Sequence, residues 1–144
     1  MEQSTTWIGL DVHQGSVTAA VWAPGASAPT VSAAPVEISK LVRWLQRVAG
    51  GGPVQVAYEA GPCGYGLVRA CQAAGVPCQV IAPSLIPQPA GGPRQRIKTD
   101  RRDAVQLVTY LRQGLLTAVA VPSAGDEALR ELTRARQQLQ REVV

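Results

Sequence analysis

Four acidic side chains occupy positions at which a carboxylate is unusual. Asp11 lies inside the first strand-like segment, and aspartate is rare in strands. Glu59 closes a later apolar strand, while Asp100 and Asp103 lie three residues apart on a predicted helix and so share one of its faces. If that helix packs over the ends of the two strands, all four carboxylates converge.

Converging carboxylates repel one another unless cations neutralise them. Their hard oxygen atoms suit Mg²⁺, and Mn²⁺ is a substitute with the same ligand preference. Two such ions about 3.5–4 Å apart can activate an attacking oxygen and stabilise a leaving oxygen in phosphoryl transfer. The four acids therefore predict a metal-dependent site that acts on a phosphodiester.

A cluster of cations lies next to two of these acids, and it consists of Arg94, Arg96, Lys98, Arg101 and Arg102. Residues 1–93 hold four basic and four acidic side chains, whereas residues 94–144 hold ten basic and six acidic ones, which accounts for the whole net charge of +4. Clustered cations favour a polyanionic partner, and we expect these five to bind nucleic acid. A solvated basic loop explains the charge alone equally well.

Each acid also has an ordinary structural explanation. The helix dipole favours Asp100 and Asp103 in a first turn, where neighbouring cations can pair with them. Glu59 could be a surface residue at a strand end. The run from Asp11 to Ser16 is similar to the first phosphate hairpin of actin-like ATPases, but no second phosphate hairpin follows it. His13 should face the same side as Asp11, and a strand-end histidine is favoured over a metal ligand.

Hydrophobic periodicity and turn residues predict the strands and helices that carry these residues. The pattern predicts strands at 6–13, 16–22, 30–36, 54–58 and 78–82, helices at 39–49, 64–74 and 100–113, an extended segment at 115–121 and a long helix at 123–144. The order β-β-β-α-β-α-β-α is typical of an α/β fold, a mixed five-stranded sheet flanked by helices. Because the first strand of such a meander commonly lies beside the next parallel strand, Asp11 and Glu59 should be neighbours.

Composition excludes several classes of protein. A chain of 144 residues with 46% hydrophobic and 17% charged residues is suited to one folded domain with an appendage, not to a disordered protein. No apolar run approaches the roughly 18–20 residues that span a bilayer, and the polar start has no secretory signal. The three cysteines are spaced too widely for a zinc knuckle. They are expected to be buried, reduced thiols of a cytoplasmic protein.

Three stretches carry a family resemblance: "IGLDVH" at 8–13, "YEAGPCGYGLVRACQAAGVPCQVIAP" at 58–83 and "RIKTDRRDAVQLVTYLRQGLL" at 96–116. With them the chain resembles the N-terminal RuvC-like domain of DEDD-type bacterial insertion-sequence transposases. The resemblance implies an RNase H-like fold over residues 1–122. It also implies that Asp11, Glu59, Asp100 and Asp103 are the catalytic tetrad, which uses Mg²⁺ to cleave and rejoin DNA strands in transposition.

The chain departs from the pattern of that family at its C-terminus. Family members carry a second domain with a serine thought to be the nucleophile toward DNA, and this sequence ends at Val144 without it. Some members are guided by a non-coding RNA, which the motifs leave open. Leu129, Leu132, Leu139 and Val143 follow a heptad pattern that suits a coiled coil or a helix packed on its own domain. We expect this helix to support a homo-oligomer of the full-length protein.

Three other functions stay in competition with the transposase. A self-contained RNase H-like junction resolvase would cleave without any further domain. A catalytically silent nucleic-acid-binding module would need the basic cluster but not the carboxylates. An actin-like nucleotide-binding half-domain would use Asp11 and Gly15 around phosphate. A Walker-type loop is excluded, because no Lys-Ser/Thr pair follows the glycines at 61, 64 and 66.

Overall fold

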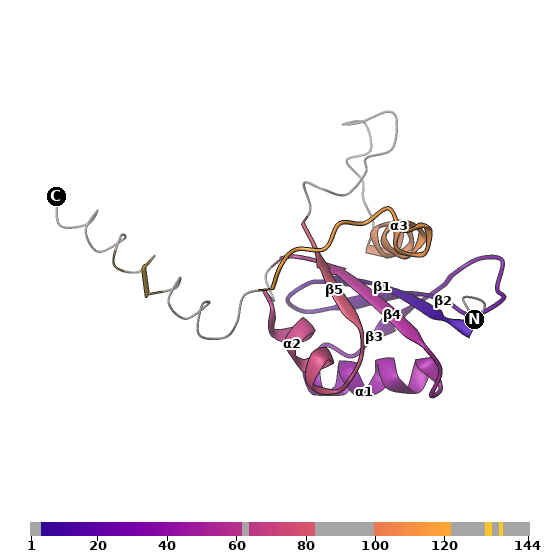
Figure 1. Ribbon diagram of the computed structural model, residues 1–144, viewed down its shortest axis with the longest axis horizontal. Coiled ribbons are helices and arrows are strands. Elements are labelled where there is room, and N and C mark those ends of the chain that lie inside the picture. The colour runs from indigo at the N-terminus through magenta and orange to yellow at the C-terminus, as the bar shows by residue number, and fades with distance from the viewer. Residues whose placement is uncertain (1–3, 62–63, 83–99, 122–131, 134–135, 137–144) are drawn as a thin grey trace, which may run out of the picture.

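A computed structural model of the chain describes residues 4–61, 64–82, 100–121, 132–133 and 136, with Asp100 described in its backbone only. Its elements are β1 (Thr6–Val12), β2 (Val17–Trp22), β3 (Thr30–Ala34), α1 (Ile38–Ala49), β4 (Val54–Glu59), α2 (Gly66–Ala73), β5 (Cys78–Ile81) and α3 (Asp100–Gln113). They form one mixed five-stranded sheet with flanking helices (Figure 1), which confirms the predicted fold class and is consistent with an RNase H-like fold. Most of the predicted helix at 123–144 lies outside the described residues.

The strands are arranged in the order β3-β2-β1-β4-β5, with β1 at the centre. β1 and β2 form the predicted antiparallel hairpin, whose turn is closed by a 2.9 Å hydrogen bond from the His13 N–H to the Ser16 carbonyl. β4 runs parallel to β1, and β5 runs parallel to β4. The expectation that the first strand lies beside the strand that ends at Glu59 is therefore confirmed.

The predicted extended segment at 115–121 adds only a short contact to the sheet. Ala118 forms an isolated antiparallel bridge with Ile81, and the Val119 N–H donates a 2.7 Å hydrogen bond to the Val80 carbonyl. This segment therefore covers part of the outer edge of β5 without becoming a full strand. Within the described part of the chain, no helix combines the length and the apolar character needed to cross a bilayer.

Side-chain alternation gives the sheet two distinct faces. Ile8 and Leu10 of β1 and Tyr58 of β4 point to one face, where they are fully buried against α1 and α2. Helices α1 and α2 lie together on this side of the sheet, while α3 lies alone on the other (Figure 1). Large apolar residues fill the first face, so most of the hydrophobic core is there.

A row of small residues lies under α3 on the second face. Gly9 is paired with Ala20 of β2 and with Ala57 of β4, so the row crosses three strands. A Cβ atom at Gly9 would lie 2.7 Å from the Val108 nitrogen and 2.8 Å from the Ala104 oxygen. The backbone of α3 therefore lies directly on β1, and only glycine leaves room for it.

Candidate active site

Asp11 is a buried carboxylate near the end of the central strand. Its side chain is 10% exposed, and its Oδ2 lies 3.0 Å from Nε2 of His13. A buried carboxylate is costly unless hydrogen bonds or cations compensate it, so this contact stabilises the unusual position. With the proton on Nε2, the His13 imidazole donates to Asp11 and helps to orient its carboxylate.

Glu59 lies beside Asp11 on the neighbouring parallel strand. The last register pair of the two strands is Leu10 with Tyr58, so Asp11 and Glu59 are the next residue on each strand. Glu59 itself is paired with Ile81, which is buried against α3, and paired residues point to the same face of a sheet. Asp11 and Glu59 therefore share the α3 face, on strands about 4.8 Å apart.

The direction of α3 brings its first turn toward these two acids. The last turn holds Arg112, whose guanidinium lies 4.4 Å from the ring of Trp22, and Trp22 is paired with Trp7 near the start of β1. The middle of the helix lies over Gly9. The helix therefore runs antiparallel to β1, and its N-terminal end lies toward the strand ends that carry Asp11 and Glu59. Asp100 and Asp103 are on that end of the helix.

The structure describes the side chains of three of the four predicted ligands, Asp11, Glu59 and Asp103. Asp103 is half-buried, and the structure describes no side chain for Asp100. Among the side chains that are described, no group of three or more His, Cys, Asp or Glu residues is close enough to hold a metal ion. The structure thus brings Asp11 into contact with His13 and directs Glu59 and Asp103 toward the same end of the sheet.

The donors at this end of the sheet suit a hard cation. They are carboxylates from three different elements, β1, β4 and α3, and Asp11 is already buried as the ligand of such an ion would be. Oxygen donors of this kind are the ones that Mg²⁺ and Mn²⁺ prefer. The residues present therefore fit the metal that the sequence predicts.

Two of the five predicted nucleic-acid-binding cations can be located. Arg101 and Arg102 lie exposed on the first turn of α3, beside the candidate acids. Arg94, Arg96 and Lys98 lie outside the described residues. Binding of nucleic acid by these cations stays a prediction.

Two contributors to the site lie outside the predicted tetrad. His13 was expected to face the same side as Asp11, but its direct bond to that carboxylate was not predicted. The signal was its place two residues after Asp11 in the sequence. Tyr58 is buried before Glu59, and its hydroxyl donates a 2.9 Å hydrogen bond to the Gly64 carbonyl and accepts one of 3.2 Å from the Val68 N–H. These bonds anchor the segment that follows β4 to the start of α2.

Two cysteines are free thiols, as predicted, and Cys63 lies outside the described residues. Cys71 of α2 is buried and Cys78 of β5 is half-buried. A hydrogen bond with Cys71, together with burial, raises the pKa of the Cys78 thiol above its ordinary range. A thiol with a raised pKa stays protonated and unreactive at neutral pH, which suits a structural role in the core.

Most of the chain is similar to known transposases. A family model described as a transposase, of the DEDD and IS110 type, matches residues 8–144. A Leptospira borgpetersenii transposase for insertion sequence element IS1533 is 30% identical over 138 residues, covering 92% of this chain and 38% of that protein. A Sinorhizobium fredii protein assigned as a transposase, y4qE, is 54% identical over 83 residues, covering 58% of this chain and 20% of that protein. The chain thus spans less than two fifths of the length of either relative.

Proposed function

This chain belongs to the DEDD transposase family of IS110 type, and from that premise we propose that it is the metal-dependent catalytic domain that cleaves and rejoins DNA strands during transposition. Residues 1–122 form this catalytic domain in the proposal, and residues 123–144 begin a connecting helix. The substrate is DNA, and in the full-length protein the connecting helix supports a homo-oligomer.

One observation carries the proposal. Asp11 and Glu59 are adjacent in register on parallel strands and share the face on which α3 lies. The antiparallel course of α3 over β1 turns its first residues, with Asp100 and Asp103, toward the same end. Carboxylates that three elements bring toward one end of a sheet repel one another, and a bound cation would neutralise them.

The residues of the chain have separate tasks in this reaction. Asp11, Glu59, Asp100 and Asp103 would hold Mg²⁺, which when bound activates an attacking oxygen and stabilises the leaving oxygen of a phosphodiester. His13 orients the Asp11 carboxylate through its 3.0 Å contact. The five cations of the basic cluster hold the phosphates of the strand in place.

The proposal is tested by separating metal binding from nucleic-acid binding. Asp11→Asn and Asp103→Asn should each weaken Mn²⁺ binding to the 144-residue chain, measured by titration calorimetry, because a neutral amide is a poor ligand for this ion. Cleavage is measured in a chain extended to the length of its relatives. It should fall by more than the roughly 10–100-fold loss that is typical when a residue behind a metal ligand is replaced. DNA affinity should be kept or raised, because a negative charge is removed.

Glu37→Gln is the matched control, since it removes an exposed carboxylate on the other side of the sheet. It should change neither Mn²⁺ binding nor cleavage. If Asp103→Asn cleaves as well as the parent, the acids are not the catalytic centre and a silent binding module is the better account. Metal-dependent cleavage by the 144-residue chain alone would instead indicate a self-contained nuclease.

A further inference from the structure

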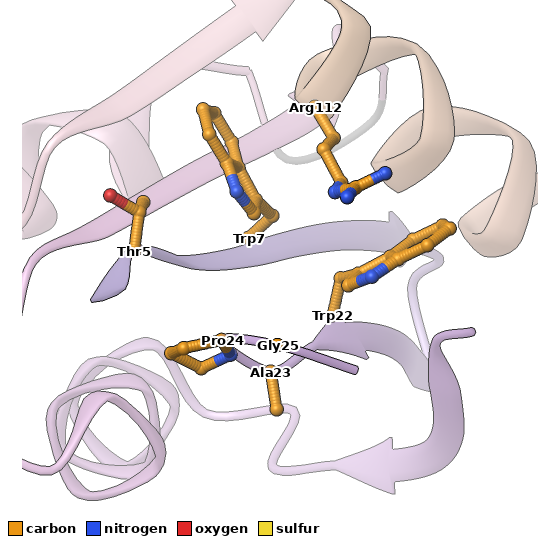
Figure 2. A pocket seen from close by; sticks show the side chains of 7 residues that line it. All are labelled: Thr5, Trp7, Trp22, Ala23, Pro24, Gly25 and Arg112. Atoms are coloured by element: carbon orange, nitrogen blue, oxygen red, sulfur yellow. The ribbon is translucent and has the colours of Figure 1, made fainter. Parts of the chain in front are cut away.

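A pocket of about 420 Å³ lies at the opposite end of α3 from the candidate active site. Its lining residues are Thr5, Trp7, Trp22, Ala23, Pro24, Gly25 and Arg112. Figure 2 shows the two indoles rising from adjacent strands while Arg112 reaches down from α3 toward Trp22. Two of the three tryptophans of the chain therefore line one half-exposed cavity.

The walls of this pocket are held in place by hydrogen bonds and strand pairing. The Trp22 indole N–H donates a 2.8 Å hydrogen bond to the Ala26 carbonyl, and the Ala26 N–H donates one of 3.1 Å to the Ala23 carbonyl. Trp7 is paired with Trp22 across the hairpin and packs against buried residues of α3. A ligand would thus meet preformed aromatic surfaces, which lowers the ordering cost of binding.

The charge of the pocket selects an anionic ligand. Arg112 is exposed and its guanidinium lies 4.4 Å from the Trp22 ring centroid. No acidic residue belongs to the described lining. Indoles provide stacking surfaces for a base, and a guanidinium can both stack on a ring and bind a phosphate. A nucleotide matches both features, because it combines a flat aromatic base with a phosphate.

From these features we propose that the pocket binds one nucleotide of a single-stranded DNA segment, with the base against the indoles and the phosphate on Arg112. The inference rests on the proposed function, because it assumes a DNA substrate. Arg112 lies twelve positions after Asp100 in α3, a helical rise of about 18 Å. At about 3.4 Å per stacked nucleotide, the bound nucleotide lies roughly five positions from the phosphodiester at the acids.

The test places a negative charge in the pocket and the same charge just outside it. Ala23 and Ala28 are both exposed residues of the loop after β2, and only Ala23 lines the pocket. Ala23→Glu should weaken binding of a single-stranded oligonucleotide by roughly tenfold, with a much smaller effect on a duplex of the same sequence. Ala28→Glu should leave both affinities near those of the parent.

A second pair of variants tests the cation. Arg112→Gln should weaken single-strand binding as Ala23→Glu does, whereas Arg47→Gln removes the equivalent arginine from the last turn of α1 and should not. In a Trp44→Phe background only the two pocket indoles emit, so their fluorescence should be quenched by the single-stranded oligonucleotide. An RNA oligonucleotide of the same sequence, run in parallel, shows whether the pocket prefers DNA.

Each failure has a separate meaning. Equal losses for Ala23→Glu and Ala28→Glu, or unquenched indoles at saturation, would overturn the pocket while leaving the catalytic proposal intact. Stronger quenching by an acidic peptide than by DNA would also overturn it and indicate a protein ligand. If Asp103→Asn cleaves as well as the parent and single-stranded DNA does not quench the two pocket indoles, both the proposed function and this inference are wrong.

Discussion

The two faces of the sheet differ in the size of the side chains that the central strands β2, β1 and β4 bury there. On the α1 and α2 face, Leu10, Leu45 and Tyr58 are fully buried among other large residues. On the α3 face, Gly9 and two alanines lie under the helix, and the carboxylate of Asp11 is buried near them.

The difference shows how one sheet meets two requirements. Large apolar side chains on the first face bury the most surface and so contribute most of the stability. Small residues on the second face let the α3 backbone approach the strands closely, which sets the separation between the acids of α3 and those of β1 and β4. We therefore expect substitutions on the first face to lower the free energy of unfolding, and substitutions on the second face to weaken Mn²⁺ binding at the site.

The largest effect on stability is expected at Leu45 of α1, which is fully buried. Leu45→Ala should reduce the free energy of unfolding by about 2–5 kcal/mol, because it removes apolar contacts and leaves a cavity. Leu115→Ala, at a residue that is 51% exposed, is the control and should change little. Urea denaturation measures both, and the folded Leu45→Ala protein should keep its Mn²⁺ affinity. A loss of that affinity would break the proposed division between the faces.

Gly9→Ala should affect both stability and the site. The added Cβ would lie within 3 Å of two backbone atoms of α3, so the helix must move. We expect a loss of about 1–3 kcal/mol in the free energy of unfolding, together with weaker Mn²⁺ binding to the remaining folded protein. Gly15→Ala is the matched control, because nothing lies within 4 Å of a Cβ there. Unchanged metal affinity in Gly9→Ala would show that the position of α3 is not needed for the site.

A smaller effect is expected at Tyr58, whose hydroxyl caps the start of α2 through the Val68 N–H. Tyr58→Phe should cost about 1–2 kcal/mol, since a backbone donor and the Gly64 carbonyl lose their partner. Tyr110→Phe is the comparison, because the hydroxyl of Tyr110 accepts a long bond of 3.4 Å from Gln106. Equal unfolding midpoints for both variants would contradict the capping role.

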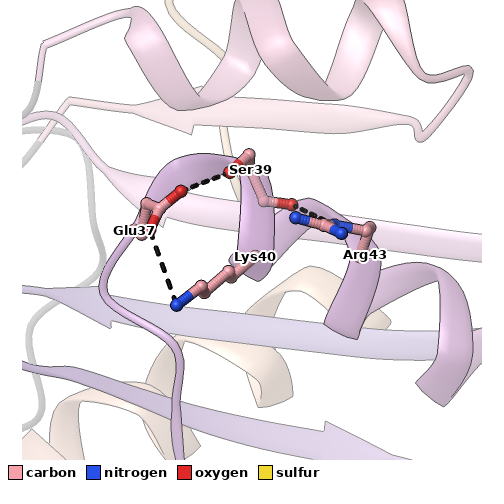
Figure 3. Close-up of polar contacts among 4 residues, drawn as sticks. All are labelled: Glu37, Ser39, Lys40 and Arg43. Carbon is pink, nitrogen blue, oxygen red and sulfur yellow. Dashed lines mark hydrogen bonds and ion pairs between the residues drawn. The ribbon is translucent and has the colours of Figure 1, made fainter.

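The smallest effect is expected at Glu37, before α1. Figure 3 shows its carboxylate between the Ser39 hydroxyl, which donates a 2.6 Å hydrogen bond, and Lys40 at 3.7 Å. Ser39 first and then Lys40 hold the pKa of Glu37 below its ordinary value of 4.5. Because the pKa of Glu37 is lower in the folded than in the unfolded protein, the stabilisation is fully present above the unfolded pKa. It is lost as pH falls through the folded pKa.

Glu37 is fully exposed, so this stabilisation is screened by solvent. Glu37→Gln should therefore lower the thermal midpoint only slightly at neutral pH, and the difference in midpoint between parent and variant should disappear below the folded pKa. A difference that grows in acid would show that the pKa of Glu37 is raised on folding, not lowered.

Local elements were predictable because their signals are local. The turn after His13, the alternation along residues 6–13 and the glycine at 114 led to a hairpin and a helix close to those observed at β1, β2 and α3. Glycines and prolines set such boundaries by backbone geometry alone, and periodicity sets which face is apolar. The predicted helix at 64–74 proved shorter, Gly66–Ala73, because the φ of 56° at Gly64 lies outside the helical region.

Residue types and their spacing were enough to find the chemically unusual positions, namely a carboxylate inside a strand and two acids on one turn of a helix. They were also enough to find the hydrophobic periods that make β1 and α3. Three features required the folded structure: the antiparallel course of α3 over β1, the bond between His13 and Asp11, and the position of Arg112 on Trp22. These features depend on contacts between residues far apart in the sequence, such as Gly9 with Ala104 and Val108, and no local pattern encodes such packing.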